Sequence, residues 1–162
     1  MKLFNLILPA AMLLILSGCS SEQPAPMLEV SKSMTINAGL DDVWGYAGDF
    51  CAISVWHPAV ETCEISDEDG TTYRILTLGD GAQIKERHDG ATATGYSYTI
   101  IEGPLPVKDY SSTFEAVEDA GSTTINWSSS FMSEGATDDE AKEVINGIYD
   151  GGLATIAGNF EE

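Results

Sequence analysis

The sequence contains few basic residues. Its 162 residues include 7 lysines and arginines against 26 aspartates and glutamates, which gives a formal net charge of −19 at pH 7. A surface this acidic repels phosphate groups, so it argues against a nucleic-acid partner and against electrostatic binding to anionic lipid. A saline habitat would produce the same composition, and composition alone does not separate the two explanations.

Residues that catalyse reactions or bind metals are also scarce. There are 2 histidines, His57 and His88, and neither belongs to a recognisable Ser-His-Asp or Cys-His arrangement. No H-E-x-x-H segment and no paired C-x-x-C segments indicate a metal site. The sequence therefore predicts no metal and no cofactor, and it gives little support to an enzymatic activity.

Long apolar runs are absent except near the beginning of the chain. Residues 3–16 form an apolar run behind Lys2, too short to span a bilayer, and Leu16-Ser17-Gly18-Cys19 completes it. This order resembles a bacterial lipobox, which implies cleavage before Cys19 and a diacylglyceryl anchor, commonly with a further acyl chain such as palmitate. We therefore predict a lipoprotein signal peptide at residues 1–18 and a lipidated tether at residues 19–27. The alternative is an ordinary secretory leader with an incidental cysteine.

The lipobox predicts a location in the cell envelope, on the periplasmic face of a membrane. Ser20 follows Cys19 where an aspartate would favour the inner membrane, so the outer membrane is slightly favoured by analogy with enteric bacteria. Assigning Cys19 to the anchor leaves Cys51 and Cys63 as an even pair in an oxidising compartment. These two cysteines form either a disulfide, worth on the order of 3 kcal/mol, or two buried free thiols.

Residues 72–127 contain four runs of alternating residues separated by short turn signals, which predicts an antiparallel meander with one apolar face. A strand at residues 28–37 and two short helices, at 41–50 and 52–56, precede it. The predicted strands after the helices are residues 60–66, the two strands of a hairpin at 72–88, and residues 93–102, 107–117 and 122–132, with turns at 67–70 and 89–90.

The first hairpin of the meander has a three-residue turn, Gly79-Asp80-Gly81, which fixes its register. Counting outward from the turn pairs Leu76 with Ile84 and Arg74 with Glu86 on the apolar face. Arg74 and Glu86 are then either a desolvated pair kept for specificity or function, or a surface ion pair at an open end of the hairpin, worth roughly 0–1 kcal/mol.

The last hairpin collects large apolar side chains on one face. A four-residue loop at 118–121 would place Phe114 near Ile125, Ser112 near Trp127 and Tyr110 near Ser129. The predicted inner face of this hairpin consists of Tyr110, Phe114, Ile125, Trp127 and Phe131.

The chain ends in a predicted amphipathic helix. Thr137 and Glu140 have the spacing of a capping box, and apolar residues recur behind them at steps of three and four. Gly151 and Gly152 each cost such a helix roughly 1 kcal/mol relative to alanine. Either close packing against the sheet or room for a ligand beneath the helix would explain them. The predicted apolar stripe is Ala141, Val144, Ile145, Ile148, Gly152, Ile156 and Phe160.

The predicted order of elements is β-α-α-β6-α. Several segments strengthen a resemblance that covers about residues 28–160: Phe50-Cys51-Ala52-Ile53, Trp56-His57-Pro58-Ala59-Val60, Arg74-Ile75-Leu76, Ile84-Lys85-Glu86-Arg87, Tyr96-Ser97-Tyr98 and Gly103-Pro104-Leu105-Pro106-Val107. These segments resemble bacterial SRPBCC proteins of the polyketide cyclase/dehydrase type, in the START-like superfamily. The resemblance implies an α+β helix-grip fold, in which a curved antiparallel sheet wraps around the C-terminal helix. The branch with the W-H-P and G-P-L-P-V segments includes proteins named after an accessory factor of periplasmic methanol oxidation.

In this superfamily a cavity between the sheet and the terminal helix binds lipids, sterols, polyketides or other apolar molecules. The resemblance implies a similar cavity here, mostly apolar with a few placed polar groups. Each aromatic residue in it, taken singly, is better explained as ordinary core, and only the collection of these residues on one concave face favours a binding site. The implied cavity-facing residues are Arg74, Leu76, Glu86, Tyr96, Tyr98, Tyr110, Trp127, Ile148 and Tyr149, with Trp56 and His57 at the mouth.

Three functions follow as hypotheses. The first is a lipid-anchored envelope protein that binds a hydrophobic or amphipathic small molecule. The second is an accessory module for a periplasmic enzyme, with the acidic surface meeting a basic protein partner. The third, which the sequence favours least, is a cyclase or dehydrase in which Arg74, Tyr96 or Tyr98 transfers a proton or Glu86 acts as general base.

Overall fold

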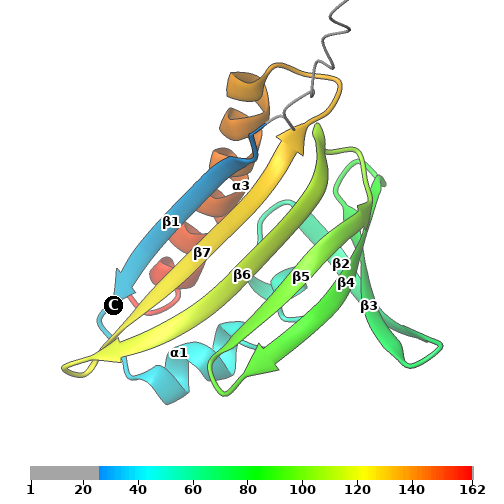
Figure 1. The fold of residues 1–162 in the computed structure, drawn as a ribbon. Helices are drawn as coiled ribbons and strands as arrows, with labels where there is room; N and C mark the ends of the chain where they lie inside the picture. Colours follow the sequence, from blue (N-terminus) through cyan, green and yellow to red (C-terminus); the bar gives the residue numbers. More distant parts are fainter. Residues whose placement is uncertain (1–25, 162) are drawn as a thin grey trace, which may run out of the picture.

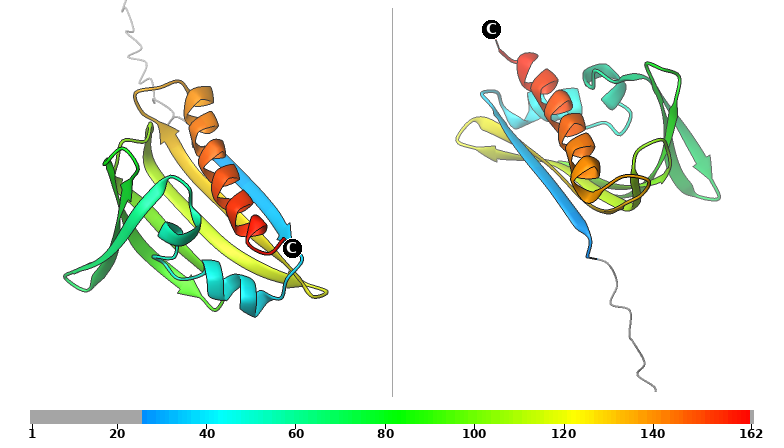
Figure 2. Two further views of the ribbon diagram at one scale, coloured as in Figure 1. Left: turned by 180° about the vertical axis from the view of Figure 1, so that it is seen from behind. Right: turned by 90° about the horizontal axis from the view of Figure 1, so that it is seen from above.

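A computed structural model describes residues 26–161 and shows a seven-stranded antiparallel sheet curved around a long C-terminal helix (Figure 1). The strands lie in the order β1-β7-β6-β5-β4-β3-β2. Helix α3 crosses the concave side of the sheet, and the two short helices lie on the same side (Figure 2). The elements are β1 (Leu28–Ile36), α1 (Leu40–Ala47), α2 (Ile53–Trp56), β2 (Val60–Glu68), β3 (Thr71–Leu78), β4 (Gln83–Thr92), β5 (Gly95–Glu102), β6 (Val107–Asp119), β7 (Ser122–Ser133) and α3 (Asp138–Gly158).

The predicted α+β helix-grip fold is confirmed, with the predicted order of elements. The predicted signal peptide at residues 1–18, Cys19 and nearly all of the tether lie outside the described residues. Among the described residues, none of the helices is both long and apolar enough to cross a membrane.

The β3–β4 hairpin has the predicted register. Arg74 lies opposite Glu86 and Leu76 opposite Ile84. Gly81 has a φ of +84°, a conformation that glycine adopts without a steric penalty. The three-residue turn therefore places the charged pair on the concave face of the sheet.

The turn predicted at Asp89-Gly90 is wrong. Strand β4 continues through both residues, and the register shifts between His88 and Gly90, which is the mark of a β-bulge. The Asp89 carboxylate accepts hydrogen bonds from Arg87 Nε at 2.6 Å and from Thr99 Oγ1 at 2.5 Å. An Asp-Gly pair suits a bulge as well as a turn, and the Thr99 bond holds the bulge against β5.

Two turns are shorter than predicted. Asp69-Gly70 and Ala120-Gly121 form two-residue connections with positive φ at every position, between +50° and +87°. The second turn shifts the β6–β7 register by two residues, so Phe114 pairs with Trp127 rather than with Ile125. Because side chains alternate with a period of two, this shift leaves the predicted inner face unchanged.

Helix α3 begins with the predicted capping box. Thr137 Oγ1 accepts from the Glu140 N–H at 3.3 Å, and the Glu140 carboxylate accepts from the Thr137 N–H at 2.9 Å. The buried face is rotated from the predicted stripe, because Tyr149 and Leu153 are buried while Val144 is 39% exposed. The predicted stripe also ended at Phe160, which lies beyond the helix.

Close packing explains Gly152. A Cβ atom there would lie 2.8 Å from His57 Cδ2, 2.9 Å from Trp56 Cζ3 and 3.0 Å from Trp127 Cζ3. Gly151 has no such constraint, since its nearest neighbour would be Pro58 Cγ at 3.7 Å. The α2 segment approaches α3 this closely only because residue 152 has no side chain.

The two cysteines within the fold form a disulfide. Cys51 and Cys63 are bonded, with their Cα atoms 5.6 Å apart. The bond joins the segment before α2 to the edge strand β2, and thus fixes the chain that covers one end of the concave face.

Candidate functional site

A cavity of about 250 Å³ lies between the N-terminal half of α3 and the concave face of the sheet. Its wall is predominantly apolar, and the carboxylate of Glu86 is the one acidic group in it among the described residues. The lining residues are Ile53, His57, Ala59, Val60, Leu76, Leu78, Ile84, Glu86, Tyr98, Ile100, Leu105, Tyr110, Trp127, Val144, Ile145 and Ile148.

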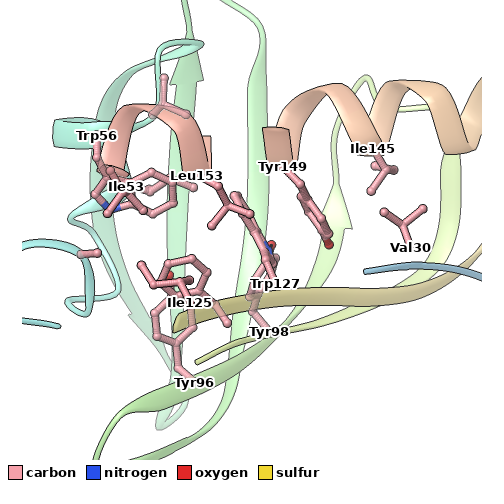
Figure 3. Close-up of a cluster of buried hydrophobic side chains, with 14 of the residues drawn as sticks. Val30, Ile53, Trp56, Tyr96, Tyr98, Ile125, Trp127, Ile145, Tyr149 and Leu153 are labelled. Carbon is pink, nitrogen blue, oxygen red and sulfur yellow. Dashed lines mark hydrogen bonds between the residues drawn. The ribbon is translucent and has the colours of Figure 1, made fainter. Parts of the chain in front are cut away.

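Seven of the predicted site residues border this cavity: His57, Leu76, Glu86, Tyr98, Tyr110, Trp127 and Ile148. The other four lie behind its wall. Trp56 was placed at the mouth, but it is 1% exposed and stacks on Phe114 with ring centroids 5.5 Å apart. Tyr149 stacks on the far side of Trp127 at 4.2 Å, and Figure 3 shows both rings beneath α3.

Arg74 and Tyr96 belong to the support of the cavity rather than to its lining. The Arg74 side chain is fully buried, and its guanidinium carbon lies 4.2 Å from the Phe50 ring centroid and 4.9 Å from that of Tyr98. Tyr96 packs against Phe50 and Phe114. Neither residue is placed to contact a molecule in the cavity.

The Arg74–Glu86 pair is desolvated, which decides between the two sequence-based interpretations. Arg74 Nε donates to Glu86 Oε2 at 2.5 Å, and Arg74 Nη1 donates to the Phe50 carbonyl. Burial opposes the charge of Arg74, yet the Glu86 carboxylate and the two neighbouring tyrosines raise the pKa of this guanidinium above its usual value. Burial raises the pKa of Glu86, and Arg74 opposes that rise. Arg74 therefore holds a carboxylate at the inner end of an otherwise apolar cavity.

A separate network of hydroxyl groups lies at the same inner end of the cavity as Glu86. Trp127 Nε1 donates to Tyr98 Oη at 3.0 Å and to Ser112 Oγ at 3.2 Å. Tyr149 Oη lies 2.6 Å from Tyr110 Oη and 3.2 Å from Ser112 Oγ. Burial raises the pKa of both Tyr98 and Tyr110 well above the usual tyrosine value, so both remain protonated hydroxyls. Tyr98 accepts the tryptophan bond, so its own O–H is a hydrogen-bond donor at the edge of the cavity.

His57 is a neutral member of the cavity wall. The Ala59 N–H donates to its Nδ1 at 3.2 Å, so the ring proton is on Nε2, which donates to the Ile148 carbonyl at 3.0 Å. Burial lowers the pKa of His57, and the nearby Arg74 lowers it further, against the effect of the Ile148 bond. The ring thus joins the α2 segment to α3 across the cavity.

Nine lining residues were missed as site residues by the sequence reasoning, and two of them had a clear signal. Leu78 and Ile84 lie on the same hairpin face as Leu76, so the predicted register already placed them there. Leu105 lies in the quoted G-P-L-P-V segment, which had been treated only as a family marker. The remaining six come from α2, the loop after it, β2, β5 and α3: Ile53, Ala59, Val60, Ile100, Val144 and Ile145.

The ionisable groups of the cavity are engaged by other groups of the protein. Within residues 26–161, His, Cys, Asp and Glu side chains form no group of three that could hold a metal ion. Glu86 is paired with Arg74, and His57 uses both ring nitrogens in hydrogen bonds. What the cavity offers a ligand is an apolar wall and, at its inner end, one carboxylate and one hydroxyl donor.

Comparisons with known proteins agree with this geometry. The sequence model of the family described as polyketide cyclase / dehydrase and lipid transport matches residues 27–161. The protein XoxI from Bacillus cereus is 30% identical, with a TM-score of 0.78 over 83% of this chain and 96% of that one. A search of curated proteins finds no match.

Two more distant structures share the fold. The ZhuI aromatase/cyclase from Streptomyces sp. R1128 is 24% identical, with a TM-score of 0.66 over 83% of this chain and 93% of that one. A START superfamily protein from Mycobacterium smegmatis is 15% identical, with a TM-score of 0.67 over 82% of this chain and 96% of that one. From its sequence match and its seven-stranded helix-grip fold, the chain belongs to the polyketide cyclase / dehydrase and lipid transport family.

Proposed function

We propose that this protein binds an apolar small molecule in the cavity beneath α3, and that Cys19 anchors it by lipid to the cell envelope. The observation that carries the binding proposal is the cavity itself, whose apolar wall ends at Glu86 and Tyr98. If the space between α3 and the sheet served only as hydrophobic core, side chains would fill it, as they fill protein interiors in general. The ligand is then an apolar body with a hydrogen-bonding group at one end.

The volume limits the size of the ligand. A dry cavity of roughly 150 Å³ holds benzene, and typical ligand sites span roughly 300–1,000 Å³. At about 250 Å³ the cavity suits one or two rings or a short acyl segment rather than an entire phospholipid. The ligand group that meets Glu86 is expected to donate a hydrogen bond, and the group that meets Tyr98 to accept one.

A fluorescent apolar probe tests the binding proposal. The mature chain from Cys19 onward, purified without detergent, should increase the emission of 1-naphthylamine, a two-ring apolar amine. An extract of envelope lipids should displace the probe, and native mass spectrometry should then show the bound mass. Val144→Trp places a large side chain at the exposed edge of the cavity and should reduce probe binding, with its fold intact by circular dichroism.

Glu143→Trp is the matched control, because Glu143 is an exposed neighbour on α3 that does not line the cavity. Equal probe binding by the two variants would contradict the cavity as the site. For the anchor, labelled palmitate should enter the wild-type protein, and Cys19→Ala should remove the label and release the protein from the membrane fraction.

The acidic surface supports a second candidate, an accessory module for a periplasmic enzyme. The formal charge of −19 suits a basic partner. A partner of that kind should be captured at low salt and lost at high salt, and Val144→Trp should leave its capture unchanged. A cyclase-type proton transfer by Arg74 or Tyr96 has no support from the structure, because both lie behind the wall.

A further inference from the structure

The cavity is closest to the surface at one end of the molecule, where its rim is apolar. Val144 is 39% exposed and Ala59 is exposed, while Leu78, Leu105 and Ile148 are half-buried. The polar groups Glu86 and Tyr98 are buried at the other end of the cavity. A ligand therefore meets apolar side chains first and reaches hydrogen-bonding groups only when it is fully inserted.

The described chain begins at this same end. Leu28, the first residue of β1, pairs with Phe131 in β7, and Val107 pairs with Ser133 two residues further along that strand. The Glu134 N–H donates to the Pro106 carbonyl at 3.0 Å, beside the rim residue Leu105. Figure 1 shows the chain entering β1 at the end where β7 finishes and α3 begins.

The end of the chain lies at the opposite end of the molecule. Phe160 and Glu161 border a surface hollow together with Asn37, the residue after β1. The C label in Figure 1 stands by the tip of β1. The two termini of the described chain thus lie at opposite ends of the first strand, and only the N-terminal one is next to the cavity rim.

The length between Cys19 and the fold is short. Residues 20–26 separate Cys19 from Met27, and at most about 3.6 Å per residue gives a reach of roughly 30 Å. A lipid on Cys19 would therefore hold Met27, at the same end of the fold as the rim, within about 30 Å of the bilayer. The far end of β6, 13 residues long, is about 40 Å further away at roughly 3.3 Å per residue.

The free lysines of the fold are at the rim end as well. Of the lysines and arginines in residues 26–161, Lys32, Arg74, Lys85 and Arg87 form ion pairs, which leaves Lys108 and Lys142. Lys108 is the second residue of β6, and Lys142 lies early in α3. Acidic side chains outnumber them there. Lys108 borders a surface hollow with Glu102, Asp109 and Glu134, and Asp138, Asp139 and Glu140 form the first turn of α3. This end therefore suits an uncharged lipid surface and not an anionic one.

We propose that the apolar rim rests on the membrane to which Cys19 is anchored, and that the cavity takes its ligand directly from a bilayer of neutral phospholipid. This inference rests on the proposed binding function. The ligand is then a molecule that dissolves in the bilayer and is small enough for the cavity, such as a ring compound or a short acyl chain. It also gives the lipid anchor a role in orientation, besides localisation.

Reversing the tether tests the proposal. The mature chain would be coupled through Cys19 to phosphatidylcholine vesicles that contain a small fraction of maleimide lipid and 1-naphthylamine. The matched protein carries Cys19→Ser and, after Glu162, a copy of residues 20–26 followed by a cysteine. Energy transfer from the buried tryptophans to the probe measures loading, and both proteins have the same local concentration at the membrane.

Loading should be faster from the N-terminal tether, on the order of tenfold, because only that tether holds the rim at the lipid surface. Val144→Asp in the N-terminally tethered protein should slow loading, whereas Val117→Asp, an exposed valine near the far end, should not. Equal loading from both tethers, with probe binding in solution intact, would overturn the orientation proposal and leave the binding function standing. Absence of probe binding in solution would overturn both.

Discussion

The space between α3 and the sheet has two halves that differ in what fills them. Towards the C-terminus of α3, aromatic rings fill it: Phe114 packs against Trp44, Trp56 and Trp127 with centroids 5.4–6.0 Å apart. Towards the N-terminus of α3, aliphatic side chains line a cavity of about 250 Å³. Strands β6 and β7 contribute to both halves, whereas Trp44 of α1 and Trp56 of α2 contribute only to the filled one. The filled half stabilises the fold, and the hollow half is free to bind.

Two buried leucines give the largest expected contrast between the halves. Leu153 is 1% exposed and does not line the cavity. Leu76 is 2% exposed and is part of the cavity wall. Leu153→Ala should reduce the free energy of unfolding by about 4–5 kcal/mol, since it opens a new void in a packed region. Leu76→Ala should cost only about 2–3 kcal/mol, because Leu76 already lacks neighbours on its cavity side. Urea unfolding followed by circular dichroism measures both, and equal losses would contradict the contrast.

The charged pair at the boundary of the halves gives the next largest effect. Arg74→Met leaves Glu86 buried without its partner and should cost about 3–5 kcal/mol at pH 8. The folded protein then holds the Glu86 proton more tightly than the unfolded chain does, since burial raises this pKa above its ordinary 4.5. A raised folded pKa means that stability falls as pH rises above about 4.5, so the loss should be smaller at pH 5 than at pH 8.

The double variant Arg74→Met with Glu86→Leu controls for the lost charge. Replacing a buried pair with apolar residues of similar size is often neutral. The double variant should therefore recover most of the stability and show little pH dependence from this site. A double variant as unstable as Arg74→Met would show that the guanidinium stabilises the fold mainly through Phe50 and the aromatic rings around it.

Much of the fold was predictable because strand faces follow a period of two. The glycine at the β3–β4 turn fixed the partners of Arg74 and Leu76, and both are observed. The same rule predicted the inner face of the last hairpin even though its register was wrong by two residues. A register shift of two residues leaves each side chain on the same face of the sheet, but it changes which residue lies opposite on the neighbouring strand.

The boundary between cavity and core could not be predicted in this way. Tyr96 and Tyr98 share a face of β5 two residues apart, yet only Tyr98 borders the cavity. Trp56 and His57 are adjacent, yet only His57 does. Which inward residue meets empty space depends on how far the neighbouring aromatic rings extend, and sequence periodicity carries no information about that packing.

Neighbouring glycines in α3 sharpen the contrast at smaller cost. Gly152→Ala would bring a methyl group to within 3.0 Å of three aromatic rings, and should destabilise the protein by about 1–3 kcal/mol. Gly151→Ala meets only ordinary contacts and should stabilise the helix by roughly 0.5–1 kcal/mol. Thermal unfolding of both variants measures the difference. Similar effects at the two positions would mean that the α2 segment can move away from α3.

The smallest effect comes from His57, which joins the two sides of the cavity. Burial lowers its pKa below the ordinary 6.5, so the unfolded chain binds a proton more readily than the folded protein does. The stability that His57 contributes is therefore complete above pH 6.5 and is lost as pH falls below it, by at most about 1.4 kcal/mol per pH unit. The His57→Gln variant, which does not titrate at this position, should lose less stability than the wild type between pH 6.5 and 5.5.

A bound apolar ligand buries His57 further, so probe affinity should also weaken over this range in the wild type and not in the variant. Parallel pH profiles of the two proteins would show that the ring is not desolvated by the cavity.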